Sequence, residues 1–306
     1  MEETLLVGDA FGEELLKRMR QTASEGDAVS IETVDKNNGL KRRGIVIRSA
    51  DSKVSPVFYL DLLYEKHWDN MTLDEIVQAI WLYYAEDENI KKIEVHDFLD
   101  WERVKSRLYL RVISTDMNRE TLDTAIHRDY LDLSVVVYVK MDHPSGDGVA
   151  YVIVRKEHLA IWEQDEEMVY EIALQNTRQE NISFVSITNA ISSMLSERDR
   201  GMLLCDDLLA FDCPLYVLTN EASHFGAVCM LLPEVMDHIV DEKKDDLYVL
   251  PSSIHEILVV AVSEVNNVSY LRDLVQDVNE KQVLMEHRLS NHVYRYSKEH
   301  GLEIAA

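Results

Sequence analysis

The sequence predicts an α+β protein made of repeated strand-strand-helix modules, with mostly antiparallel sheets and helices packed on one face. Two β-rich runs surround a Ser/Asp/Pro turn at residues 44–68, and a helix pattern follows at 71–90. The same order recurs at 131–162, with two β-rich runs, and at 164–176, with a helix pattern. Hairpins that alternate with single helices argue against a doubly wound sheet, in which strands and helices alternate one for one.

The N-terminal part begins with an amphipathic helix pattern at 10–23. The helix at 71–90 carries a capping box, because Thr72 stands at its start and Glu75 follows three residues later. Residues 108–113 are expected to form a strand between the first two modules. The basic run at 40–44 is expected in a solvated turn beside the first hairpin.

The C-terminal part is a third, less regular module. Its pattern predicts strands at 214–220, 226–232, 246–253 and 255–263, and helices at 233–244 and 268–280. Pro233 favours a helix start, because its fixed φ suits the first helical position. Residues 280–300 are compatible with one long helix or with a loop and a hairpin that turns at Gly301, and we favour the break.

The repeated pattern suggests three modules. Residues 1–100 hold the N-terminal helix and the first module, 101–180 the second module, and 181–306 the third module with its C-terminal helix and hairpin. The chain has only 5 prolines and 10 glycines and no low-complexity linker. The modules should therefore join by short ordered connections.

Charge and composition exclude several classes of function. The formal net charge is −25, from 56 acidic and 31 basic residues. A nucleic-acid partner is therefore not expected, because phosphates are met by clustered lysine and arginine. An acidic surface permits a protein partner instead. No apolar run approaches the ~18 residues of a membrane span and no secretory signal begins the chain, so we expect a cytoplasmic protein that does not enter a membrane.

The cysteines and the known cofactor motifs predict neither a metal nor a cofactor. Cys205, Cys213 and Cys229 are odd in number and suit neither a disulfide framework nor a zinc knuckle, so we interpret them as buried thiols. No phosphate-binding loop and no GxGxxG after a strand occurs. A metal-binding pair of His287 and His292 would require the helical interpretation of the tail.

One short segment, residues 248–260, places Ser253, His255 and Glu256 between two apolar runs. The simpler interpretation is the joint of a β-hairpin, with serines that close a turn after Pro251 and an interior, hydrogen-bonded histidine. The alternative is a Ser-His pair on one face of a strand, the minimum for an activated nucleophile. Two residues along a strand separate side chains by about 6–7 Å, which is too far for a hydrogen bond without a bend.

A resemblance covers nearly the whole chain. The segments 247–260, 274–280 and 289–296 resemble an uncharacterised family of cytoplasmic bacterial proteins of similar length. Residues 172–177 and the proline, histidine and acid of the 248–260 segment are similar to a second uncharacterised bacterial family. The resemblance implies a shared α+β core, and the matching positions include Asn176, Pro251, His255 and Glu256.

Two functions remain open at this point. The first is a non-catalytic intracellular interaction or regulatory protein, which the absence of catalytic motifs and the acidic composition favour. The second is a hydrolase-like or small-ligand-binding protein with a site around Ser253, His255 and Glu256. Asn176, His292 and Tyr294 are weaker binding candidates that the fold would have to bring in. Neither hypothesis names a substrate, and the oligomeric state is left open.

Overall fold

The chain divides into two compact units, and the residues that the structure describes form three antiparallel sheets. The computed structural model describes residues 2–49, 55–68, 70–86, 95–142, 149–194, 214–251 and 253–305. Unit 1 comprises Met1–Arg107 and Val139–Val152, and unit 2 comprises Leu108–Tyr138 and Ile153–Ala306. The α+β class with antiparallel pairing is confirmed. Each sheet lies almost entirely within one of the three predicted modules, while the three-module division itself stays a prediction.

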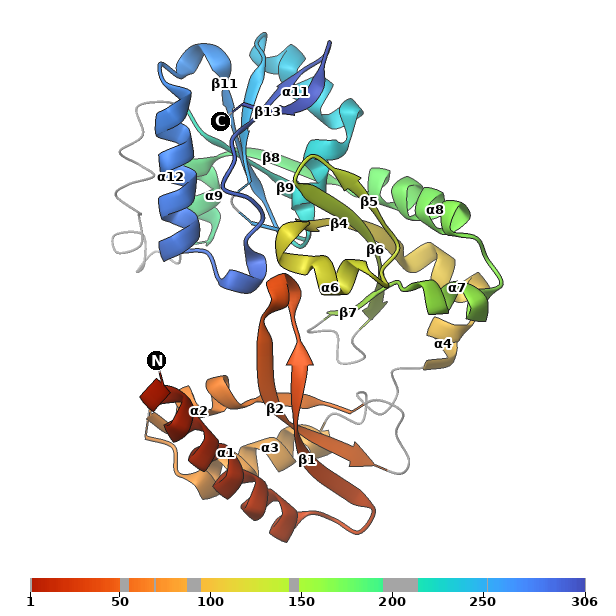
Figure 1. Ribbon diagram of the computed structural model, residues 1–306, viewed down its shortest axis with the longest axis vertical. Coiled ribbons are helices and arrows are strands. Elements are labelled where there is room, and N and C mark those ends of the chain that lie inside the picture. Colours follow the sequence, from red (N-terminus) through yellow and green to blue (C-terminus); the bar gives the residue numbers. More distant parts are fainter. Residues whose placement is uncertain are drawn as a thin grey trace. The chain divides into compact units, whose positions relative to one another are not determined.

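Unit 1 is a three-stranded sheet covered by helices. The strands β1 (Asp27–Asp35), β2 (Lys41–Ser49) and β3 (Val57–Tyr59) lie in sequence order, and Ile31 of β1 is opposite Ile45 of β2. The helices are α1 (Glu2–Thr22), α2 (Leu60–Trp68), α3 (Leu73–Glu86), α4 (Val95–Leu99) and α5 (Trp101–Val104). The apolar faces of α1, α2 and α3 share one core with the strands, to which Leu15, Ile45 and Ile76 contribute. Figure 1 shows α1, α2 and α3 gathered around this sheet.

The capping box predicted at the start of α3 is confirmed. The backbone N–H of Thr72 donates to the Glu75 carboxylate at 2.7 Å, and the Glu75 N–H donates to the Thr72 hydroxyl at 3.3 Å. These bonds satisfy N–H groups that have no partner inside the helix. They hold the Glu75 carboxylate, and its pKa is lowered mainly by the Thr72 backbone bond.

The first sheet of unit 2 has the strand order β4-β6-β5, with β4 (Leu108–Ser114), β5 (His127–Tyr130) and residues 133–138 of β6 (Leu133–Asp142) in this unit. The strand β7 (Val149–Ile153) pairs with β6, and the predicted turn at 143–148 lies outside the described residues. The elements around this sheet are η4 (Asp116–Asn118), α6 (Arg119–Leu122), α7 (Lys156–Trp162) and α8 (Glu166–Arg178). As Figure 1 shows, α8 lies beside β4, and its Thr177 hydroxyl accepts the N–H of Leu110 at 2.9 Å.

The second sheet of unit 2 has six antiparallel strands in the order β13-β12-β10-β11-β9-β8. Their bounds are β8 (Ile182–Ser186), β9 (Tyr216–Asn220), β10 (Leu247–Leu250), β11 (Ile257–Ala261), β12 (Tyr294–Ser297) and β13 (Gly301–Ile304). One face packs on α12 (Val268–Lys281) and α9 (Ile187–Met194) through a core that includes Leu258, Val260 and Leu271. A second layer consists of α11 (Pro233–Lys243) and the 3-10 segment η5 (Gly226–Leu231). The Tyr296 hydroxyl of β12 donates to Asp237 of α11, and η5 lies against β9.

The favoured break in the tail is confirmed. The helix α12 ends at Lys281, a 3-10 turn η7 (Met285–His287) follows, and β12 pairs with β13 as a hairpin. Gly301 has a φ of +69°, the left-handed conformation that glycine adopts at low cost. The remaining short element, η6 (Val262–Glu264), follows β11.

Four local predictions are wrong. Residues 60–68 form α2 and 156–162 form α7, where strands were expected; in α2, Leu60 and Leu63 are both buried at helical spacing. The apolar run 226–231 is η5, since a fully buried run does not distinguish strand from helix by its periodicity. The basic run belongs to β2, where Arg42 pairs with Asp61.

Candidate functional site

The segment between β10 and β11 forms a hairpin joint, as the simpler interpretation expected. Leu250 at the end of β10 is opposite Leu258 of β11, and the connection falls within residues 251–256, of which the structure describes 251 and 253–256. The Ser253 hydroxyl donates to the Glu256 carboxylate at 2.8 Å and accepts the N–H groups of His255 at 3.0 Å and Glu256 at 3.3 Å. The hydroxyl is therefore engaged with Glu256 and the backbone, while a catalytic role for these residues stays a prediction.

His255 is half-buried among aromatic and imidazole rings. Its ring lies parallel to Phe225, and its centroid is 4.7 Å from that of His224 and 4.6 Å from that of His287. The Phe225 N–H donates to Nδ1 of His255 at 3.3 Å. Burial, and then the neighbouring His224, His287 and Arg111, lower the pKa of His255 to about 4. His255 is therefore neutral at pH 7, with its proton on Nε2 because Nδ1 accepts.

Glu256 and Asn176 have structural contacts. Burial raises the pKa of Glu256, although the Ser253 hydroxyl and His287 oppose this effect. The Asn176 side chain donates to the backbone oxygen of Leu108 at 2.9 Å, which attaches α8 to the start of β4. Asn176 therefore lies where α8 meets the first sheet of unit 2. This hydrogen bond explains why a side-chain amide stands at that position.

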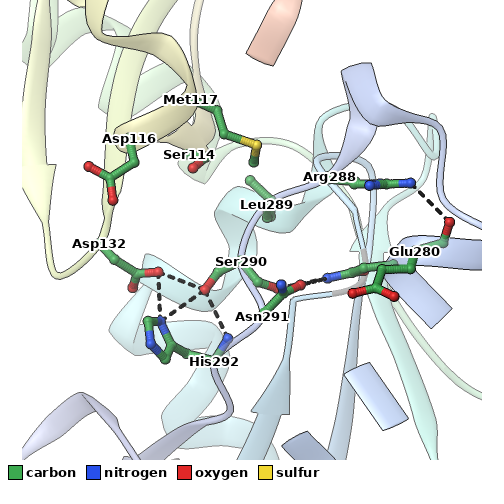
Figure 2. Close-up of a pocket in the computed structure, with 11 residues that line it drawn as sticks. Ser114, Asp116, Met117, Asp132, Glu280, Arg288, Leu289, Ser290, Asn291 and His292 are labelled. Carbon is green, nitrogen blue, oxygen red and sulfur yellow. Dashed lines mark hydrogen bonds and ion pairs between the residues drawn. The ribbon is translucent and has the colours of Figure 1, made fainter. Parts of the chain in front are cut away.

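A pocket of about 360 Å³ lies within unit 2. One part of its lining comes from the end of β4, from η4 and from the turn between β5 and β6, and the other from the end of α12 and the segment that precedes β12. The lining residues are Ser114, Asp116, Met117, Asp132, Asn279, Glu280, Arg288, Leu289, Ser290, Asn291 and His292 (Figure 2). The volume is within the range of small-molecule sites.

Asp132 is the centre of a hydrogen-bond network on the wall of this pocket. Its carboxylate accepts from the Ser290 hydroxyl at 2.6 Å, from His292 Nδ1 at 3.0 Å and from the Tyr294 hydroxyl at 2.8 Å. The Ser290 oxygen also accepts the backbone N–H of His292 at 3.0 Å. Figure 2 shows Asp132, Ser290 and His292 meeting in this way. Two segments distant in the sequence thus build one preorganised polar wall.

The electrostatics of this wall follow from these contacts. Burial alone would raise the pKa of Asp132, but the bonds from Ser290, His292 and Tyr294 together lower it below its ordinary value. Burial raises the pKa of Tyr294, and the Asp132 charge adds to this effect. Asp132 is thus ionised at neutral pH, and His292 donates from Nδ1 because a carboxylate only accepts.

The structure brings together two of the weak binding candidates, His292 and Tyr294, and places them on Asp132. Sequence reasoning missed Asp132, which stands in the two-residue loop between β5 and β6. Leu131 in the same loop has a φ of +57°, an uncommon conformation for a residue with a branched side chain. The signal in the sequence that could have pointed to Asp132 is the loop itself, because its two residues are Leu and Asp, whereas two-residue hairpin loops favour Asn-Gly.

Of metal clusters, free thiols and membrane spans, the described ranges contain a buried thiol alone. No group of three or more His, Cys, Asp or Glu side chains there is arranged to hold a metal ion. Cys229 is a free, buried thiol whose pKa is raised to about 12 by burial and by Glu180, whereas Cys205 and Cys213 lie outside the described residues. No helix in the same part of the chain is long and apolar enough to cross a membrane.

The comparisons with known proteins identify a family without a known activity. No curated protein matches the chain, and no solved structure matches it. A family model described as "Family of unknown function (DUF5688)" matches residues 9–298. This match spans both units and every candidate residue discussed above, so the chain belongs to the DUF5688 family.

Proposed function

We propose that this protein is a non-catalytic regulatory protein that binds a small, positively charged ligand in the pocket at Asp132. The observation that carries the proposal is the carboxylate of Asp132, held on the pocket wall by Ser290, His292 and Tyr294. Ligand sites are concave and have a few polar groups fixed in place, and such fixing lowers the cost of binding.

The charges around the pocket favour a cationic ligand. Asp116, Asp132 and Glu280 contribute three carboxylates, and Arg288 contributes one guanidinium. Arg288 already donates to the backbone oxygens of Val283 and Glu280, at 3.0 and 3.1 Å. The net charge of the pocket lining is therefore negative, and a negative lining raises the local concentration of cations.

The position of the pocket supports a regulatory role. Its walls belong to the loops of one sheet and to the segment before β12 of the other, so a bound ligand would contact both. Binding to the folded state alone stabilises that state by mass action. The ligand would thereby strengthen the contact between the two sheets. This change would alter the affinity of the acidic surface for a protein partner.

Several contacts favour binding over catalysis. The Ser290 hydroxyl donates to Asp132, and the Ser253 hydroxyl donates to Glu256, so both protons are directed to carboxylates and not to an imidazole. In the Ser-His arrangement considered above, an imidazole has to take the proton of the nucleophilic serine. Hydrolase-like chemistry at Ser253, His255 and Glu256 is the alternative proposal and has this arrangement against it.

The proposed setting is the cytoplasm of a bacterium, without a nucleic-acid partner. The net charge of −25 supports the absence of a nucleic-acid partner. The free thiol of Cys229 suits a reducing compartment. The distant similarity to a second uncharacterised family remains part of the proposal.

Calorimetric titration with putrescine, spermidine and L-arginine, against citrate as an anionic control, tests the function. We expect at least one cation to bind the wild type and Glu280→Gln to weaken that binding, because Glu280 lines the pocket. Asp277→Asn is the matched control, since Asp277 lies on the same helix, pairs with Lys281 and does not line the pocket. Equal losses in both variants, or binding of citrate alone, would contradict the proposal.

A further inference from the structure

Arg111 is a buried arginine in β4 that has no acidic partner among the residues the structure describes. Its relative exposure is 8%, and its Nε is buried without a hydrogen-bond partner. Its guanidinium carbon lies 4.8 Å from the centroid of the Phe225 ring. No carboxylate in the described ranges forms an ion pair with it. An uncompensated buried charge is costly, so a cation kept in this state points to an anionic ligand as its partner.

Three imidazoles form a cluster whose central member, His255, stacks on the Phe225 ring that this guanidinium covers. His255 lies between His224 and His287, at the centroid distances given above. The charge of Arg111 acts on His255, which places the two groups within electrostatic reach. Because Nδ1 of His255 accepts from Phe225, its Nε2 is a donor. Guanidinium and imidazole N–H groups are the donors that oxyanions use.

The backbone that carries these rings is strained and firmly held. Phe225 has a φ of +58°, which is an outlier for a bulky side chain. The Asn220 side chain exchanges two hydrogen bonds with the backbone of His224, at 2.9 and 3.0 Å, and the Thr219 hydroxyl donates to the backbone oxygen of His255 at 2.7 Å. Strain that the surroundings maintain is concentrated at functional sites.

We propose that Arg111, with the imidazoles of His224, His255 and His287, forms a binding site for a phosphate-type oxyanion. None of these four residues lines the pocket at Asp132. The site is therefore separate from the proposed cation site and of opposite charge preference. The two proposals stand or fail independently.

Inorganic phosphate is the probe, with chloride at equal ionic strength as the reference and acetate as a carboxylate control. We expect phosphate to raise the melting temperature of the wild type more than chloride or acetate, and the rise to grow with the logarithm of its concentration. A wild type that responds equally to phosphate and chloride would overturn the site. An equal response to acetate would overturn its assignment to phosphate.

The variant Arg111→Met distinguishes between an arginine that binds an anion and an arginine that only stabilises the fold. We expect equal or higher stability in chloride, because a buried unpaired charge is removed, together with a loss of at least about tenfold in phosphate affinity. Arg128→Met is the matched control, since Arg128 is also a strand arginine over an aromatic ring, Tyr170, but pairs with Glu167. The control should keep the phosphate response.

Two further variants keep the test decisive if Arg111→Met does not fold. Arg111→Lys keeps the charge but loses the planar fork, and we expect several-fold weaker phosphate binding in calorimetry. His287→Gln removes one imidazole and should also weaken binding, while Arg128→Met does not. Unchanged phosphate affinity in both variants would refute the proposal.

Discussion

Replacing Tyr294 by Phe removes one hydrogen bond from the Asp132 network and leaves the packing in place. The Tyr294 ring is fully buried, and its hydroxyl donates to Asp132 at 2.8 Å. A hydrogen bond to a charged group contributes about 1.5–3 kcal/mol, so we expect Tyr294→Phe to lower the free energy of unfolding by about 2 kcal/mol. Urea denaturation at pH 7, followed by circular dichroism, measures this loss.

A double-mutant cycle with Asp132→Asn isolates the pair. If the hydroxyl acts through the carboxylate, the two single losses should not add, and the coupling free energy should be about 1–2 kcal/mol. Tyr296→Phe, two residues along the same strand, is the control, because its hydroxyl donates to Asp237 and not to Asp132. The network would be refuted if the coupling free energy between Asp132→Asn and Tyr294→Phe were no larger than that between Asp132→Asn and Tyr296→Phe.

The same network predicts a pH dependence of known sign. The pKa of Asp132 is lower in the folded chain than in the unfolded chain, so its contribution is present above the unfolded value of about 3.9. That contribution is lost as the pH falls through the lower, folded value. In Tyr294→Phe one of the bonds that lower the pKa is absent. The variant should therefore lose less stability than the wild type over this acidic range.

Three more predictions follow from single contacts. Thr72→Ala should lower the stability of unit 1 by about 1 kcal/mol in thermal denaturation, whereas Thr72→Ser, which keeps the cap, should not. Gly226→Ala should cost about 1–3 kcal/mol in urea unfolding, because the added Cβ would lie 2.5 Å from the Asn220 nitrogen; an unchanged midpoint would contradict the packing. The His255 pKa of about 4 predicts a loss of about 1–2 kcal/mol, allowing for solvent screening, as the pH falls from 6.5 to 4, and His255→Gln should remove this slope in pH-dependent melting curves.

Elements with a signal inside a few residues were predictable. The capping box of α3, the Pro233 start of α11 and the Gly301 hairpin each depend on neighbouring residues, and the structure has all three. Elements whose conformation depends on packing against distant parts of the chain were not predictable. The run that became η5 is apolar throughout and buried throughout, so neither its periodicity nor its composition distinguishes a strand from a helical turn.

The candidate site was predictable only in part. The 253–256 turn was located correctly as a hairpin joint, because serines and a proline between two apolar runs are a local signal. His292 and Tyr294 were weak candidates without a partner in the sequence. Their partner, Asp132, lies 160 residues from His292, a separation that no local pattern bridges.

The sequence by itself determined the α+β class, the antiparallel hairpins, the positions of α3, α8, α11 and α12 and the acidic charge, because periodicity, caps and composition act over short distances. Only the tertiary structure decided that Asp132 meets Ser290, His292 and Tyr294, and that Arg111 is buried on the Phe225 ring that His255 also contacts, without an ion pair among the described residues. The physical reason is that burial, charge partners and pKa values are set by groups from distant strands that share one environment. Such groups become neighbours only when the sheets have formed and packed.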